Sequence, residues 1–134
     1  MLTLTLTLSS ALAFALVTAL TIELDVQPRA TVERDGSILV RGTVTCSGQA
    51  TVSIEGQVVE QLNHSRVAEG VFTAEVVCDT TATPWTATVT PNTNVRFRPG
   101  SASIGVRGTA LDPESGVFTS VQSDGFLQLA RSGR

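Results

Sequence analysis

Two cysteines, Cys46 and Cys78, are the residues of this sequence with the clearest chemistry. They are the only cysteines of the 134-residue chain, and both fall on the apolar phase of alternating segments. Neither belongs to a Cys-x-x-Cys motif, and the charged neighbour of Cys78 is Asp79, which disfavours a reactive thiolate. We therefore expect one structural disulfide inside the domain, between two strands that face each other or lie side by side.

His64 is the sole histidine and lies in the polar run 61–66. Ser65 follows it directly, but no nucleophile elbow surrounds this serine, so we interpret the segment as a solvated loop. One histidine and two oxidised cysteines cannot supply a four-ligand zinc site. The sequon that begins at Asn63 matters only in a eukaryotic secretory pathway.

The acidic residues offer no marked catalytic pair. Asp112 and Glu114 share a turn that lacks the dense oxygen ligands of a calcium loop. Glutamates could pair as the acid and base of a glycosidase, but they are distinguished only by being acidic at outward strand positions; these are Glu55 with Glu60 and Glu69 with Glu75. We predict no enzymatic activity, no metal site and no cofactor.

Arg96 and Arg98 alternate on one expected strand, and Arg107 lies on the next. The simplest interpretation is a solvated face. The alternative is a contact with a partner or an anionic ligand, because guanidinium groups suit carboxylates and phosphates. The net charge is -3 with nine basic residues, so the sequence predicts no nucleic-acid partner and no attraction to anionic lipid.

The segment before Glu23 carries no charge and has its apolar centre at residues 11–20. Val17-Thr18-Ala19 ends on the small residue that signal peptidase requires, although no basic residue follows Met1. We predict a signal peptide over 1–19, possibly to 22; an uncleaved anchor and a genuine first strand, suggested by the Leu-Thr alternation of 2–8, remain open. The expected location is extracellular or at the cell surface, without membrane contact once the leader is removed.

Beyond Arg29, apolar residues recur with a period of two, which is typical of antiparallel sheets with one buried face. Turn residues separate these runs at the spacing of a sandwich or barrel. We predict an all-β, antiparallel sandwich of about seven to nine strands, with a short N-terminal extension over 20–29 and a single domain over 30–134. The expected core positions are Ile38, Val40, Val44, Cys46, Ala50, Val52, Ile54, Phe72, Ala74, Val76, Cys78, Trp85, Ala87, Val89, Val95, Phe97, Ala102, Ile104 and Val106.

Two hairpins are predicted in detail. Around Asp35-Gly36, a three-residue loop, Asp35–Ser37, would pair Val32 with Val40 and keep both inside, with a glycine bulge. At the other end of the chain, residues 117–121 and 126–130 are compatible with a final hairpin about Asp124-Gly125.

The run 35–48, DGSILVRGTVTCSG, resembles the opening of a family of small secreted actinobacterial domains without an assigned function. The resemblance covers about residues 31–106 and continues at Gln61, Cys78-Asp79, Trp85, Phe97 and Gly100. It implies an immunoglobulin-like fold with one disulfide, and it supplies no active site.

We therefore expect a monomeric, non-catalytic binding or structural module whose partner is a protein or a component of the cell envelope. An open hydrophobic cleft would instead indicate a carrier of a small apolar ligand. Polar residues that converge in a deep pocket would indicate an enzyme of unrecognised type.

Overall fold

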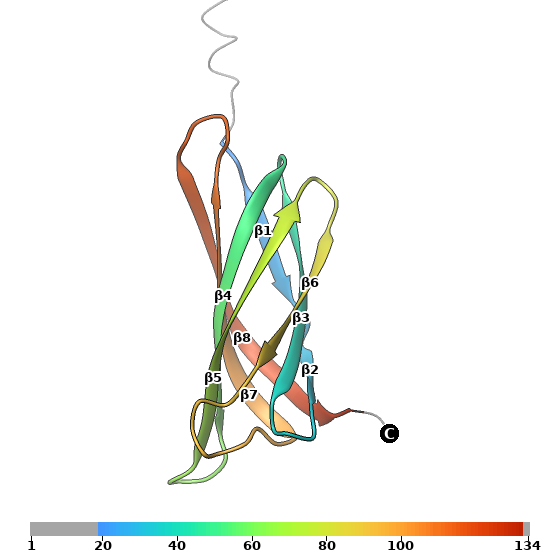
Figure 1. The fold of residues 1–134 in the computed structure, drawn as a ribbon, viewed down its shortest axis with the longest axis vertical. Coiled ribbons are helices and arrows are strands. Elements are labelled where there is room, and N and C mark those ends of the chain that lie inside the picture. Colours follow the sequence, from blue (N-terminus) through green and yellow to red (C-terminus); the bar gives the residue numbers. More distant parts are fainter. Residues whose placement is uncertain (1–18, 133–134) are drawn as a thin grey trace, which may run out of the picture.

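The computed structural model describes residues 19–132, which form eight β-strands and no helix (Figure 1). The strands are β1 (Ile22–Val26), β2 (Arg29–Val32), β3 (Ile38–Cys46), β4 (Ala50–Gln61), β5 (Val67–Cys78), β6 (Thr83–Val89), β7 (Gly100–Leu111) and β8 (Phe118–Arg131). The predicted all-β class is confirmed. Within the described part of the chain, no helix is long and apolar enough to cross a membrane.

All eight strands belong to one mixed sheet of order β1-β3-β2-β8-β7-β4-β5, and β6 pairs with the free side of β3. Every pair is antiparallel except β2–β8, which is parallel, so the prediction of a strictly antiparallel fold is wrong at this pair. Pro28 lies between β1 and β2 and has no N–H for a ladder. The ladder with β3 is interrupted at this proline and resumes at Thr31, while β2 also pairs with β8 from Arg29 onward. β2 therefore connects the two halves of the sheet.

The sheet folds over so that its ends, β5 and β6, lie beside each other without a continuous ladder. The Asn92 N–H donates to the carbonyl of Glu69 at 2.8 Å, and a Cβ at Gly70 would lie 2.5 Å from the Thr90 carbonyl oxygen. The predicted disulfide is confirmed: it joins Cys46 of β3 to Cys78 of β5, with Cα atoms 5.7 Å apart. Because β3 and β5 are not paired in the sheet, the disulfide connects two separate parts of it.

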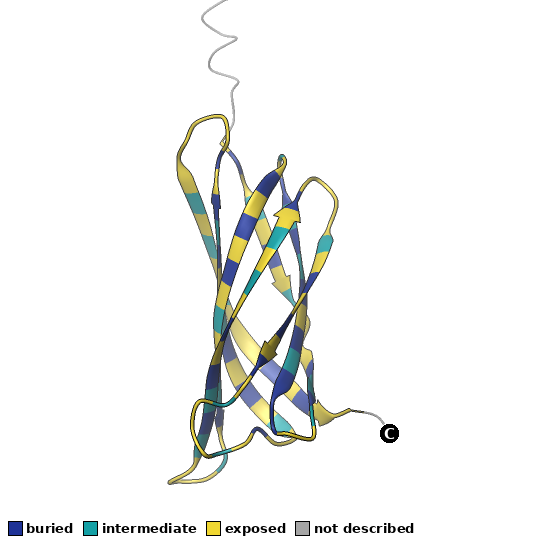
Figure 2. Ribbon diagram, in the orientation of Figure 1, coloured by how far each residue is buried: buried dark blue, intermediate teal, exposed yellow. Residues whose placement is uncertain are grey.

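The inner face carries the alternating apolar residues, and Figure 2 shows buried and exposed positions following each other along the strands. Trp85 is buried, as predicted, and its ring stacks on that of Phe72 with centroids 6.0 Å apart. Of the expected core positions, Ala74, Val76 and Val95 are only partly buried and pack against the core cluster.

The segment predicted as an N-terminal extension contributes a strand. β1 pairs with β3 from Ile22 opposite Cys46 to Val26 opposite Gly42, and Leu20 and Leu24 are buried in the core. Residues 20–26 are therefore part of the domain. The predicted leader, apart from Ala19, lies outside the described residues.

The β2–β3 hairpin has a three-residue loop, as predicted, but the loop is Arg34–Gly36 and Val32 pairs with Ile38. The Glu33 N–H donates to the Ser37 carbonyl at 2.8 Å, and Gly36 has φ of 89°. The third residue of such a loop adopts the left-handed conformation that favours glycine, so Gly36 sets the register. Val32 and Val40 are nevertheless both buried in the core, as predicted.

Two other predicted elements are absent from the described residues. β8 runs without interruption along β7, and Gly125 faces Ile104 within this ladder, so the predicted hairpin at Asp124-Gly125 is wrong. The turn lies instead at 112–117, where the Asp112 N–H donates to the Val117 carbonyl at 2.9 Å. Residues 95–98 form a loop rather than a strand, although Phe97 is buried.

Candidate functional site

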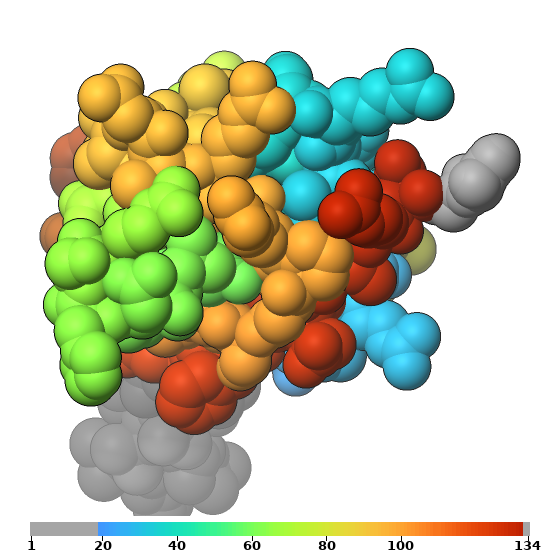
Figure 3. Space-filling model, turned by 90° about the horizontal axis from the view of Figure 1, so that it is seen from below, coloured from blue at the N-terminus to red at the C-terminus, as the bar shows by residue number. Residues whose placement is uncertain are grey.

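Arginines from three segments converge at the end of the molecule farthest from Ala19. The β2–β3 loop, the β6–β7 loop (residues 90–99) and the end of β8 meet there, as Figure 3 shows in cyan, orange and red. A hollow of about 480 Å³ at this end is lined by four arginines and one acidic residue: Arg34, Arg96, Arg98, Arg131 and Glu33. We call it the arginine pocket.

The backbone fixes where these arginines start. Arg131 lies opposite Val32 in the parallel β2–β8 ladder, which brings it beside the β2–β3 loop. The Phe97 N–H donates to the Gly36 carbonyl at 3.1 Å. The stem of Arg96 covers Gly36 so closely that a Cβ at Gly36 would lie 2.6 Å from the Arg96 Cβ. Gly36 therefore shapes the turn and also makes room for Arg96.

Glu60 anchors the second loop from inside. Its side chain is 2% exposed, and its Oε1 accepts the backbone N–H of Arg98 at 2.9 Å. Burial raises the pKa of Glu60, while the Arg98 N–H and guanidinium charge oppose the shift. Glu60 thus holds the loop that carries Arg96 and Arg98.

The nearby Asp35 is occupied by a local hydrogen-bond network. Its Oδ1 accepts the Ser37 hydroxyl at 2.6 Å and the Ser37 N–H at 3.0 Å. These bonds lower the pKa of Asp35, with a smaller effect from the charge of Arg96. Among the described residues, no hydrogen bond joins a guanidinium of the pocket to another side chain. The pocket therefore presents guanidinium groups to solvent, and such groups bind carboxylates and phosphates.

The three arginines singled out from the sequence do not lie at one site. Arg96 and Arg98 line one pocket, although they lie on a loop. Arg107 lies on β7, opposite Glu55 of β4 and Gln122 of β8, away from that pocket. Sequence analysis missed Arg34 and Arg131 as members of the site because only the chain topology brings them to it.

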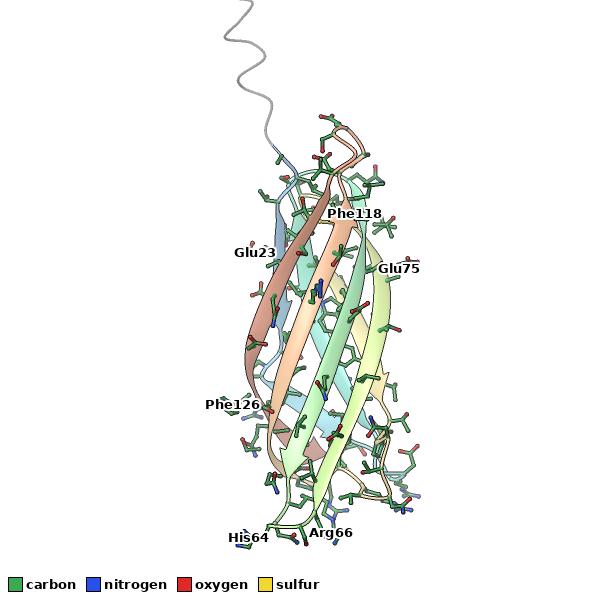
Figure 4. All side chains as sticks on the ribbon, turned by 90° about the vertical axis from the view of Figure 1, so that its left-hand side faces the viewer. Glu23, His64, Arg66, Glu75, Phe118 and Phe126 are labelled. Carbon is green, nitrogen blue, oxygen red and sulfur yellow. A yellow bond between two sulfur atoms is a disulfide. The ribbon has the colours of Figure 1, made fainter. Side chains whose placement is uncertain are left out.

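A second surface is the outer side of strands β5, β4, β7 and β8, which we call the outer face (Figure 4). Phe118 is 70% and Phe126 77% exposed there. The other strongly exposed large apolar residues of the described chain lie on the same face or on its β7–β8 turn: Val71, Val77, Leu111 and Val117. A hollow of about 860 Å³, which includes Gly105, Arg107 and Asp124, opens on this face.

The remaining candidates show no shared chemistry. His64 and Arg66 lie on the exposed β4–β5 turn (Figure 4), where Asn63 Oδ1 accepts the Ser65 N–H at 3.0 Å. Within residues 19–132, no three histidine, cysteine, aspartate or glutamate side chains are grouped as metal ligands would be. Glu60, expected on an outward face, points inward instead.

Asp112 is the other buried carboxylate. Its Oδ1 accepts the Glu114 N–H at 3.0 Å, and its Oδ2 accepts the Leu20 N–H at 3.2 Å. Hydrogen bonding, first from Glu114 and then from Leu20, lowers the pKa of Asp112 against the opposing effect of burial. The turn thus serves as a fixed acceptor for backbone groups.

Fold and site together define a small all-β domain whose folded sheet is linked by one disulfide and whose one end is rich in arginine. The chain belongs to a family of unknown function, DUF6299, whose family model matches residues 20–124. The match includes β1, in agreement with its place in the core.

Among solved structures, the chain is similar to a Bordetella pertussis protein that carries the provisional name ApaA. The two share 13% sequence identity with a TM-score of 0.53, and the alignment covers 87% of this chain and 99% of that one. This likeness concerns the fold alone. No curated protein matches the chain.

Proposed function

We propose that this protein is an exported, non-catalytic binding module that recognises an anionic group through the arginine pocket. The uncharged leader is compatible with export. The disulfide is compatible with an oxidising compartment outside the cytoplasm. The proposal includes the finer assignment that the resemblance implied, a secreted actinobacterial domain with an immunoglobulin-like sandwich. In this view β6, β3 and β1 form one layer, and β2, β8, β7, β4 and β5 form the other.

The observation that carries the proposal is the convergence of four arginines from three segments on one hollow. The chain as a whole has a net charge of -3, so the positive charge at this pocket is opposite in sign to the charge of the whole protein. Several guanidinium groups around one hollow suit a ligand with more than one acidic oxygen. Carboxylates and phosphates of a cell-envelope component or a protein have this chemistry.

The alternatives are less well supported. A carrier needs an apolar cleft, whereas the large hollow on the outer face combines apolar residues such as Phe126 with the charged Arg107 and Asp124. An enzyme needs a nucleophile or an acid and base that face one another in a pocket, and the arginine pocket has Glu33 as its single acidic residue. A binding role requires only the guanidinium groups that line the arginine pocket.

The test is calorimetric titration of the secreted protein with tripolyphosphate and with citrate. We expect binding of at least one probe, and at least a tenfold loss of affinity in the variant R34Q/R96Q/R98Q. The control R29Q/R41Q/R107Q changes the net charge equally but leaves the pocket intact, so it should bind almost as the parent does. Both variants should change stability by about 0.5 kcal/mol or less per site.

Equal loss in the two variants would reduce the effect to net charge and refute the pocket. Failure of the parent protein to bind either probe would refute anion recognition itself. Repeating the titration with a neutral polyol of similar size separates recognition of charge from recognition of shape.

A further inference from the structure

The end of the molecule opposite the arginine pocket holds the start of β1 against the β7–β8 turn. The Leu20 N–H donates to Asp112 Oδ2 at 3.2 Å, across 92 positions of sequence. Leu20 and Asp112 are each only 7% exposed. A backbone amide and a largely buried carboxylate thus meet at the first core residue of the described chain.

The neighbouring groups fix this geometry. The Thr21 N–H donates to Ser47 Oγ at 2.9 Å, and the Ser47 N–H donates to the Thr21 carbonyl at 3.0 Å. A hollow of about 470 Å³ beside Leu20 is lined by Ser47, Asp112 and Glu114. The Asp112 contact and the two Thr21–Ser47 hydrogen bonds therefore fix the position of the Leu20 nitrogen, and the hollow leaves free space next to it.

The charges around this nitrogen have one sign. Asp112 and Glu114 come from the β7–β8 turn, Asp79 follows β5 close to Cys46, and Glu23 lies further along β1. The segments 19–21, 47–49, 79–82 and 112–117 contain no basic residue. The Leu20 and Glu114 N–H groups are neutral donors to the Asp112 carboxylate, whereas an ammonium group at Leu20 would also balance its charge.

We propose that removal of the leader after Ala19 turns this contact into a salt bridge between the α-ammonium group of Leu20 and Asp112. Hydrolysis breaks the Ala19–Leu20 amide bond and consumes one water molecule. Ala19 leaves as a carboxylate, and the Leu20 nitrogen becomes an amine that takes up a proton at neutral pH. The inference rests on the export assumed in the proposed function.

The register makes the inference specific. Cleavage after Ala13 or Ala15, where small residues also occur, would leave several residues ahead of Leu20 and keep a neutral amide at Asp112. Only the cut after Ala19 places a charge at the nitrogen that already lies 3.2 Å from the carboxylate. Maturation and folding would then be coupled, because the cleaved chain gains an ion pair that the precursor lacks.

The test compares three forms of the domain with its disulfide intact: one that begins at Leu20, one that begins at Ala19, and the first form acetylated at its amino group. We expect the free Leu20 form to melt about 4–8 °C higher than either of the others near pH 6. The difference should shrink as the pH rises past about 8, where the amino group loses its proton.

Two variants supply the controls. Asp112→Asn removes the charge and should abolish the difference between the free and acetylated forms, while Glu114→Gln makes the same charge change nearby and should keep most of it. If Asp112→Asn does not fold, the acetylation series on the parent chain still decides the matter. Equal melting temperatures of the free and acetylated parent would overturn the proposal.

N-terminal sequencing of the secreted protein separates this inference from the proposed function. A first residue of Leu20 supports both. If the secreted protein starts at another residue, export is supported, but the proposed ion pair between Leu20 and Asp112 does not form in the cell. Failure of the chain to leave the cytoplasm refutes the proposed function, whatever the melting experiments show about the Leu20–Asp112 pair.

Discussion

The two ends of the molecule have opposite charge and use it differently. The end that holds Leu20 and the β7–β8 turn carries Asp79, Asp112 and Glu114 in its loops; we call it the acidic end. The other end, with the arginine pocket and the β4–β5 turn, is the basic end. Its basic residues, Arg34, Arg66, Arg96, Arg98 and Arg131, outnumber the acidic Glu33, Asp35 and Glu60.

At the acidic end, carboxylates accept backbone N–H groups. Asp112 binds the amides of Leu20 and Glu114, and Asp79 Oδ1 accepts the Thr81 N–H at 2.8 Å. At the basic end, the carboxylates Asp35 and Glu60 are likewise engaged, but the guanidinium groups of the pocket are left to solvent. Under the proposed function, the acidic end stabilises the fold and the basic end binds.

The disulfide lies at the acidic end and should give the largest effect on stability. Replacing Cys46 and Cys78 together with alanine should lower the free energy of unfolding by about 3–4 kcal/mol, because it removes the restraint on a loop of 32 residues and buried sulfur from the core. Thermal denaturation should show a fall of about 10 °C or more. A melting temperature unchanged by reduction would contradict the structural role.

Much of this architecture could be predicted from the sequence, because alternation and turn residues are local signals. The paired faces of β3, β4 and β7 follow directly from the period of two, and the core phase of Cys46 and Cys78 indicated their disulfide. The β2–β3 loop was predicted with the right length and the wrong residues. Its register depends on which position needs a left-handed residue, and Gly36 satisfies that need only as the third residue.

What could not be predicted depends on contacts between distant segments. Asp124-Gly125 has the composition of a turn, yet the unbroken pairing of β8 with β7 keeps β8 extended through these two residues. The arginine pocket shows the same limit. Arg131 reaches it only through the parallel β2–β8 pair, for which a sequence of alternating segments gives no signal.

Two glycines, one at each end, test the comparison with an expected loss of stability that is smaller than that from removing the disulfide. Gly36 at the basic end and Gly116 at the acidic end both have positive φ, of 89° and 73°. A Cβ at Gly116 meets nothing within 4 Å, whereas one at Gly36 would collide with the stem of Arg96. Gly116→Ala should cost about 1 kcal/mol from backbone strain alone, and Gly36→Ala about 2 kcal/mol or more.

Chemical denaturation measures both costs, and titration with tripolyphosphate adds a second readout. Gly36→Ala should also weaken anion binding because it displaces Arg96, while Gly116→Ala should leave binding unchanged. Equal costs with unaltered binding would mean that Gly36 serves the turn alone and does not position the pocket.

The smallest expected effect concerns pH, and it has opposite signs at the two ends. The pKa of Asp112 is lowered from its usual value of 3.8, so its contribution is present above that value and is lost as the pH falls through the folded-state pKa. The pKa of Glu60 is raised from 4.5. Its contribution is therefore fully present below 4.5 and is lost as the pH rises through the folded-state pKa.

Glu60→Gln tests the second half of this statement, because glutamine keeps an oxygen that can accept the Arg98 N–H but carries no charge to desolvate. At pH 7 the variant should be as stable as the parent or slightly more stable, and its advantage should vanish near pH 4. Glu60→Ala, which removes the acceptor, should instead cost about 1–3 kcal/mol at both pH values. If Glu60→Gln were as destabilising as Glu60→Ala at pH 7, the ionised carboxylate would be a net stabilising group. The basic end would then depend on its buried charge just as the acidic end depends on Asp112.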